Sequence, residues 1–72
     1  MYYAEIDTVS DKLSAMVIGE TIMDTIKGII QWRKDYRWDY KDIKDMEIRD
    51  RDSDLLVLKL KFIMPNAVEF DY

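Results

Sequence analysis

The chain has 72 residues, 15 of them acidic and 11 basic, which gives a formal net charge of −4. It contains no cysteine and no histidine. This composition excludes disulfides, thiolate metal sites and histidine-based acid–base catalysis. Hydrophobic residues make up 49% of the chain, which indicates one folded domain, 1–72, near the size where a single core is only marginally stabilising.

Residues 2–9 predict a first strand, because apolar residues recur at every second position. The following segment, residues 13–37, admits two readings: one long helix, or a strand followed by a helix. In one long helix, the apolar residues of the first part would point away from those of the second part. A break at Gly19 removes this conflict, so we predict a second strand at 13–18, paired with the first as a hairpin.

A helix is predicted after this break. Thr21 can cap it, and Asp24 occupies the third helical position of a capping box. Gly28 falls on the polar side of the helical wheel, where we expect it only to weaken the helix. The helix should end near Tyr36 or Trp38. Its apolar stripe consists of Ile22, Met23, Ile26, Ile29 and Ile30.

Two further strands are predicted at 43–51 and 55–64, since apolar residues alternate with charged ones in both. Pro65-Asn66 supplies a turn, after which residues 67–72 can add a fifth, edge strand. The order β-β-α-β-β, with this optional fifth strand, predicts an α+β fold. We expect a small antiparallel sheet of four to five strands with one helix packed on one face.

The stretch RDRDSD at residues 49–54 resembles part of a calcium-binding loop, since Asp50, Asp52 and Asp54 have the required spacing. The loop pattern then demands glycine and glutamate where this chain has Leu55 and Lys61. We therefore predict no metal site here.

Strand register explains the stretch better. Apolar even-numbered residues of both strands must share the core face, which predicts a hairpin with Asp52-Ser53-Asp54 as a three-residue loop. The pairs predicted across this hairpin are Ile48–Leu58, Met46–Leu60, Glu47–Lys59 and Asp45–Lys61.

No catalytic arrangement can be assembled from the sequence. The three serines, Ser10, Ser14 and Ser53, have no histidine to activate them. The chain also lacks a glycine-rich phosphate loop. We therefore expect no enzymatic activity, no catalytic residues and no cofactor.

The segment 31–41 concentrates aromatic and cationic residues. Trp, Tyr and Arg dominate protein-interface hot spots, and aromatic rings can also stack on single-stranded nucleic-acid bases. A third reading is that the tryptophans close one end of the core. Interleaved aspartates nearly cancel the local positive charge, which counts against phosphate binding. The candidate partner-binding residues are Trp32, Arg33, Tyr36, Arg37, Trp38 and Tyr40.

A second candidate surface lies on the outer side of the fourth strand. Leu55, Val57 and Ile63 would point away from the helix, so they form a candidate oligomer face. Isolated apolar residues on a surface are also common.

These features together favour a small acidic protein-interaction module, which could act as an inhibitor or regulator of a larger protein. The alternatives are a domain that binds single-stranded nucleic acid through residues 32–41, and a homo-oligomeric structural subunit. No apolar run approaches the roughly 18 residues that a membrane helix needs, and the acidic start of the chain lacks the features of a secretory signal. We therefore expect a cytoplasmic protein with a protein partner rather than a nucleic acid or a membrane.

Overall fold

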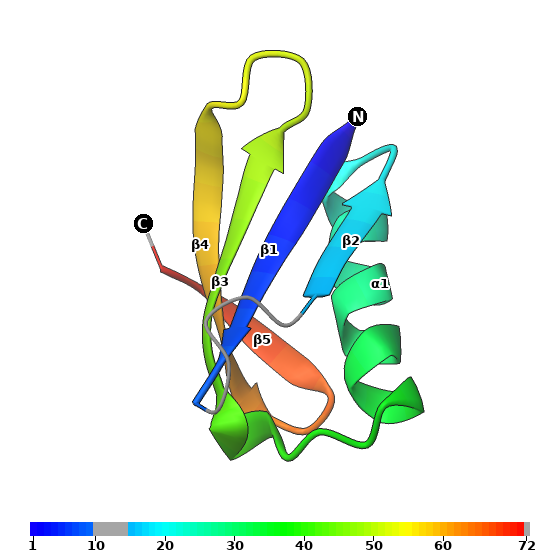
Figure 1. The fold of residues 1–72 in the computed structure, drawn as a ribbon, viewed down its shortest axis with the longest axis vertical. Coiled ribbons are helices and arrows are strands. Elements are labelled where there is room, and N and C mark those ends of the chain that lie inside the picture. The colour runs from blue at the N-terminus through cyan, green and yellow to red at the C-terminus, as the bar shows by residue number, and fades with distance from the viewer. Residues whose placement is uncertain (10–14, 72) are drawn as a thin grey trace.

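A computed structural model describes residues 1–9 and 15–71 of the chain. It has the predicted α+β architecture, a five-stranded antiparallel sheet with one α-helix on one face (Figure 1). The elements are β1 (Tyr2–Thr8), β2 (Ala15–Gly19), α1 (Ile22–Asp35), the short 3-10 helix η1 (Tyr40–Asp42), β3 (Ile43–Asp50), β4 (Leu56–Met64) and β5 (Ala67–Asp71).

The strand order in the sheet is β2-β1-β3-β4-β5. The first strand therefore lies inside the sheet, between its hairpin partner β2 and the later strand β3. This places β2 at one edge and β5 at the other. Within the described residues, α1 is not long and apolar enough to cross a membrane.

The core lies between α1 and the inner face of the sheet, defined here as the face that α1 covers. Strand alternation sends most of the even-numbered residues of β1, β3 and β4 inward and most of the odd-numbered ones outward. Ala4, Ile6, Ile29 and Ile48 are completely buried. The remaining buried apolar residues are Ile26, Ile43, Met46, Leu58 and Leu60.

Helix α1 begins as the sequence predicted. Thr21 is the N-cap, and its hydroxyl oxygen accepts a hydrogen bond of 3.0 Å from the backbone N–H of Asp24. The helix ends at Asp35, with Tyr36 as its C-cap. Its buried side includes Thr25, whose hydroxyl donates to the carbonyl oxygen of Thr21 at 2.8 Å, so burial leaves that hydroxyl satisfied.

Gly28 has a different role from the one expected. A Cβ at this position would lie 2.6 Å from Cγ1 of Val17, so α1 and β2 meet here at a distance that only glycine permits. Gly19 likewise lies under the helix, because a Cβ there would be 2.5 Å from Oγ1 of Thr25. Gly28 lies on the polar side of the helix as predicted, but the expectation that it only weakens the helix left out its packing against Val17.

The predicted register of the β3–β4 hairpin is confirmed at its centre. Ile48 lies opposite Leu58, and Met46 lies opposite Leu60. The loop, in contrast, spans residues 51–55 and not the predicted 52–54, because the register shifts between Ile48 and Arg49.

The extended loop has its own local support. The carboxylate of Asp50 accepts backbone hydrogen bonds from Asp52 at 2.8 Å and Ser53 at 3.2 Å. These bonds, that of Ser53 first, lower the pKa of Asp50 below its ordinary value. Asp54 adopts a left-handed backbone conformation with φ of 59°, which aspartate tolerates better than most residues.

The other predicted strand bounds agree with the structure to within two residues. The predicted second strand, 13–18, corresponds to β2, although residues 13 and 14 lie outside the described residues.

Candidate protein-binding surface

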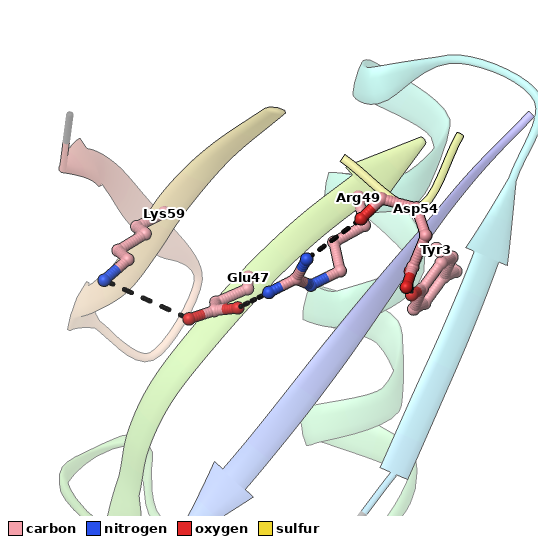
Figure 2. Close-up of polar contacts among 5 residues, drawn as sticks. All are labelled: Tyr3, Glu47, Arg49, Asp54 and Lys59. Carbon is pink, nitrogen blue, oxygen red and sulfur yellow. Dashed lines mark hydrogen bonds and ion pairs between the residues drawn. The ribbon is translucent and has the colours of Figure 1, made fainter. Parts of the chain in front are cut away.

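The outer face of the sheet, the side away from α1, is not covered by any element of the described residues. Figure 2 shows this face toward the viewer, with α1 behind the strands. Its side chains come mainly from odd-numbered positions of β1, β3 and β4. Helix α1 and the sheet therefore form two layers, and the outer side of the sheet is open within the described part of the chain.

At the centre of this open side, acidic residues of β1 lie opposite acidic residues of β3 in two cross-strand pairs. Glu5 on β1 lies opposite Glu47 on β3, and Asp7 lies opposite Asp45. Directly opposed residues in an antiparallel pair have Cβ atoms about 4.5–5.5 Å apart, and like charges in that position destabilise the sheet. We call these four residues the acidic pairs.

The acidic pairs surround a shallow hollow in the outer face. Its volume is about 190 Å³, and it is lined by Glu5, Asp7, Asp45, Met46, Glu47 and Lys59. Lys59 is the only cation of this lining. The hollow therefore presents mainly carboxylate oxygens to solvent.

Part of the negative charge is balanced by neighbouring cations. Glu47 forms an ion pair of 3.0 Å with Arg49 and a longer one of 4.0 Å with Lys59 (Figure 2). The hydrogen bond to Glu47 raises the pKa of Arg49 above its ordinary value. Among the described residues, no ion pair joins Asp7 or Asp45 to a cation. As far as the described ranges 1–9 and 15–71 show, the second acidic pair is the less compensated one.

The β3–β4 loop is tied back to the same face. The hydroxyl of Tyr3 donates a hydrogen bond to the carboxylate of Asp54, and Nη1 of Arg49 donates to the carbonyl oxygen of Asp54 at 3.0 Å (Figure 2). The bond to Asp54, followed by desolvation, raises the pKa of the Tyr3 hydroxyl above its ordinary value. These contacts hold the loop beside the Glu5–Glu47 end of the acidic pairs.

The predicted Glu47–Lys59 pair is thus present, but the predicted Asp45–Lys61 pair is not among the pairs of β3 with β4, which begin at Met46. Lys61 instead forms an ion pair of 3.1 Å with Glu69 of β5. This pair forms because β5 continues the sheet and places Glu69 opposite Lys61.

The tryptophans of the aromatic segment (residues 31–41) close the lower end of the core. Trp32 and Trp38 are partly buried and pack against the core residues. Their rings stack with centroids 6.2 Å apart and an interplanar angle of 20°. Arg33 supports this arrangement, since its Nη1 donates to the carbonyl oxygen of Trp38 at 3.0 Å.

The remaining candidates of the segment are more accessible. Tyr36 is 70% exposed, although its ring lies 6.0 Å from that of Trp32. Arg37 is exposed and adopts a left-handed backbone conformation. Tyr40 is partly buried in η1, with Nζ of Lys41 5.9 Å from its ring centroid. Of the six candidates, Tyr36 and Arg37 are therefore exposed and the other four are partly buried.

The candidate oligomer face is exposed at all three positions: Leu55 is 68%, Val57 37% and Ile63 47% exposed. Leu55 belongs to the loop before β4 rather than to the strand itself. Across the sheet, the edge strand β2 exposes Met16 and Ile18 at 54% each. Apolar side chains thus flank the charged centre of the outer face on both sides.

Sequence reasoning missed the acidic pairs because they depend on the β1–β3 pairing, which joins residues about 40 positions apart in the sequence. The alternation of each strand showed that its acids point outward. It could not show which strand would lie beside β1.

Comparisons with protein-family models, with curated proteins and with solved structures find no match to this chain.

Proposed function

We propose that this protein is a protein-interaction module that binds a partner through the outer face of its sheet. The observation that carries the proposal is the two like-charge cross-strand pairs, Glu5–Glu47 and Asp7–Asp45, at the centre of a face that no described element covers. Folding alone favours opposite charges at opposed positions. An arrangement that costs stability on an open face is expected where binding supplies the compensating charge.

The chemistry of the face indicates the chemistry of the partner. A hollow lined by four carboxylates and one lysine accommodates lysine or arginine side chains. Exposed apolar residues on β2 and β4 flank it and can pack against apolar parts of the same partner. The partner is therefore expected to present basic residues surrounded by apolar ones, and its association should weaken at high salt.

Inhibition or regulation of a larger protein is one use of such a module. The nucleic-acid alternative draws less support, because Trp32 and Trp38 use their surfaces to pack against the core and each other. The net charge of −4 also repels phosphates at long range.

The proposal is tested by neutralising the less compensated pair. A variant carrying Asp7→Asn and Asp45→Asn keeps the size and polarity of both side chains while removing two charges. Wild-type and variant protein would be immobilised at equal density, and proteins captured from an extract of the source cells would be quantified at low and at high salt. The expected result is that specific partners captured by the wild type are reduced about tenfold or more by the variant.

The matched control carries Asp42→Asn and Asp52→Asn, which change the net charge equally but lie in η1 and in the β3–β4 loop. Loss of the same partners with both double variants would show that their binding depends on net charge alone. Partners retained by the variant of the acidic pair would overturn the proposal.

A further inference from the structure

We propose that the free edge of β2 binds an extended segment of a protein partner as an added strand, and that this segment alternates basic and apolar residues. Three features carry the inference: the composition of β2, its exposed outer side chains, and a polar, partly acidic flank of α1 beside it. The proposal concerns the edge of the sheet and does not rest on the outer-face function above.

The two edges of the sheet differ in composition. Strand β2 has the sequence Ala-Met-Val-Ile-Gly, without a charged residue or a proline. Strand β5, at the other edge, has the sequence Ala-Val-Glu-Phe-Asp and follows Pro65-Asn66. Charges and proline are among the devices by which proteins prevent further pairing at an edge strand. Among the described residues β2 pairs only with β1 and has neither device.

The outer side of β2 offers apolar contacts to an added strand. Met16 and Ile18 lie on this side, opposite Glu5 and Tyr3 of β1, and each is 54% exposed. Cross-strand neighbours on one face contact each other directly. Apolar residues of the added strand would therefore be favoured at the positions that share the outer face with Met16 and Ile18.

The inner side of β2 is flanked by helix α1. Gly28 contacts Val17 of β2, and residues three or four apart share a helix face. Asp24, Gln31 and Asp35 therefore lie along the same flank of α1 as Gly28, and all three are exposed.

Helix and strand run in opposite directions here (Figure 1), and their rises of about 1.5 and 3.3 Å per residue fix their alignment. Asp24 comes beside the Gly19 end of β2, and Gln31 comes beside Ala15. Asp35, which accepts a hydrogen bond of 2.8 Å from Gln31, lies about one helical turn farther on.

Charge complementarity then selects the occupant. Inward side chains of an added strand would meet a helix flank that carries two carboxylates and an amide. The lysines of the helix, Lys27 and Lys34, fall on its more distant side at about 100° per residue. Basic residues are therefore favoured at the inward positions of the partner strand, alternating with apolar residues at the outward positions.

The experiment uses the full chain and a defined probe, the peptide acetyl-Lys-Val-Lys-Ile-Lys-Val-Lys-amide. The control peptides are one with glutamate in place of every lysine and one with the same composition but no alternation. Binding would be followed by NMR with ¹⁵N-labelled protein. The expected result is that only the alternating lysine peptide binds. It should slow the hydrogen exchange of the β2 amides that point away from β1 at least tenfold. The amides of β5 should be unchanged.

A charge reversal tests the helix flank. Asp35→Lys should weaken the affinity for the peptide about fivefold, since loss of an exposed charge pair is worth about 1 kcal/mol. Asp52→Lys changes the net charge equally at the tip of the β3–β4 loop and should have a smaller effect. Equal effects of the two reversals would show that net charge attracts the peptide, and would overturn the assignment to this edge.

The two proposals fail separately. The variant Asp7→Asn with Asp45→Asn should leave the protection of the β2 amides by the peptide the same as in its charge-matched control. Binding of the lysine peptide to β5, or to the outer face without protection of the β2 amides, would overturn the edge assignment. A concentration-dependent dimer in the free protein that Ile18→Lys abolishes would identify a second copy as the occupant of the edge and would also overturn the proposal.

Discussion

Strands β1 and β3 pair apolar residues on the inner face of the sheet and acidic residues on the outer face. On the inner side, Ala4 lies opposite Ile48 and Ile6 opposite Met46, and all four residues are 1% exposed or less. On the outer side, the same two strands carry the acidic pairs, in which like charges lie opposite each other. The two sides share one backbone and one register, so their difference lies in the side chains alone.

This difference separates stability from binding. Burial of the inner residues removes apolar surface from water, at about 25 cal/mol per Å². The acidic pairs instead cost roughly 0.2–1 kcal/mol each through repulsion across the strands. We infer that the inner side holds the sheet together, while the outer side is tuned for a partner.

The largest effect is expected on the inner side. Ile6→Ala should lower the free energy of unfolding by about 2–5 kcal/mol, because it leaves a cavity in a completely buried site. Denaturant unfolding followed by circular dichroism measures this change. Ile63→Ala, at a 47% exposed outer position, is the control and should change stability by about 0.5 kcal/mol or less. Similar losses at both positions would contradict the contrast.

A smaller effect is expected where the helix meets β2. Gly28→Ala should lower the free energy of unfolding by about 1 kcal/mol, because the clash with Val17 outweighs the gain of about 1 kcal/mol in helix propensity. The double variant, Gly28→Ala with Val17→Ala, lacks the clashing methyl group of Val17. It should therefore be less destabilised than the single variant Val17→Ala. If Gly28→Ala stabilises the protein by itself, α1 and β2 are not as close as described.

The β3–β4 loop gives a pH-dependent effect. The pKa of Asp50 is lower in the folded protein than its ordinary value of 3.8, because backbone N–H groups bind the carboxylate. The unfolded chain therefore takes up the proton first as the pH falls, so this contribution is present above about pH 3.8 and is lost below it. Acid unfolding of the wild type and of Asp50→Asn should be compared. The difference in the free energy of unfolding between them should shrink as the pH falls below about 3.8. A constant difference would contradict the assignment.

The local features of the fold could be predicted from the sequence because they follow from alternation and capping. Even-numbered apolar residues determined the register of Ile48 with Leu58, and Thr21 marked the start of the helix. The role of Gly28 could not be predicted from a helical wheel. A wheel sorts residues by polarity, and close approach to another strand requires knowing where that strand lies.

The candidate site was harder to predict for a similar reason. The aromatic segment attracted attention by composition, yet Trp32 and Trp38 pack against the core. Trp32 does so because α1 is buried over a wider arc than its isoleucine stripe. The completely buried Thr25 belongs to that wider arc. The acidic pairs depend on strand order, which alternation does not encode. The loop length was misjudged because a register shift at Arg49 adds residues to the turn.

The central claim is that the outer acids cost the fold stability, and a double-mutant cycle on Asp7 and Asp45 tests it most directly. The measurement is the free energy of unfolding of the wild type, Asp7→Asn, Asp45→Asn and the double variant at low and high salt. Each single variant should be more stable than the wild type by about 0.2–1 kcal/mol at low salt. The double variant should gain less than the sum, because one neutralisation already removes the repulsion. These gains should shrink at high salt. Single variants that are less stable than the wild type, or strictly additive gains, would contradict the account.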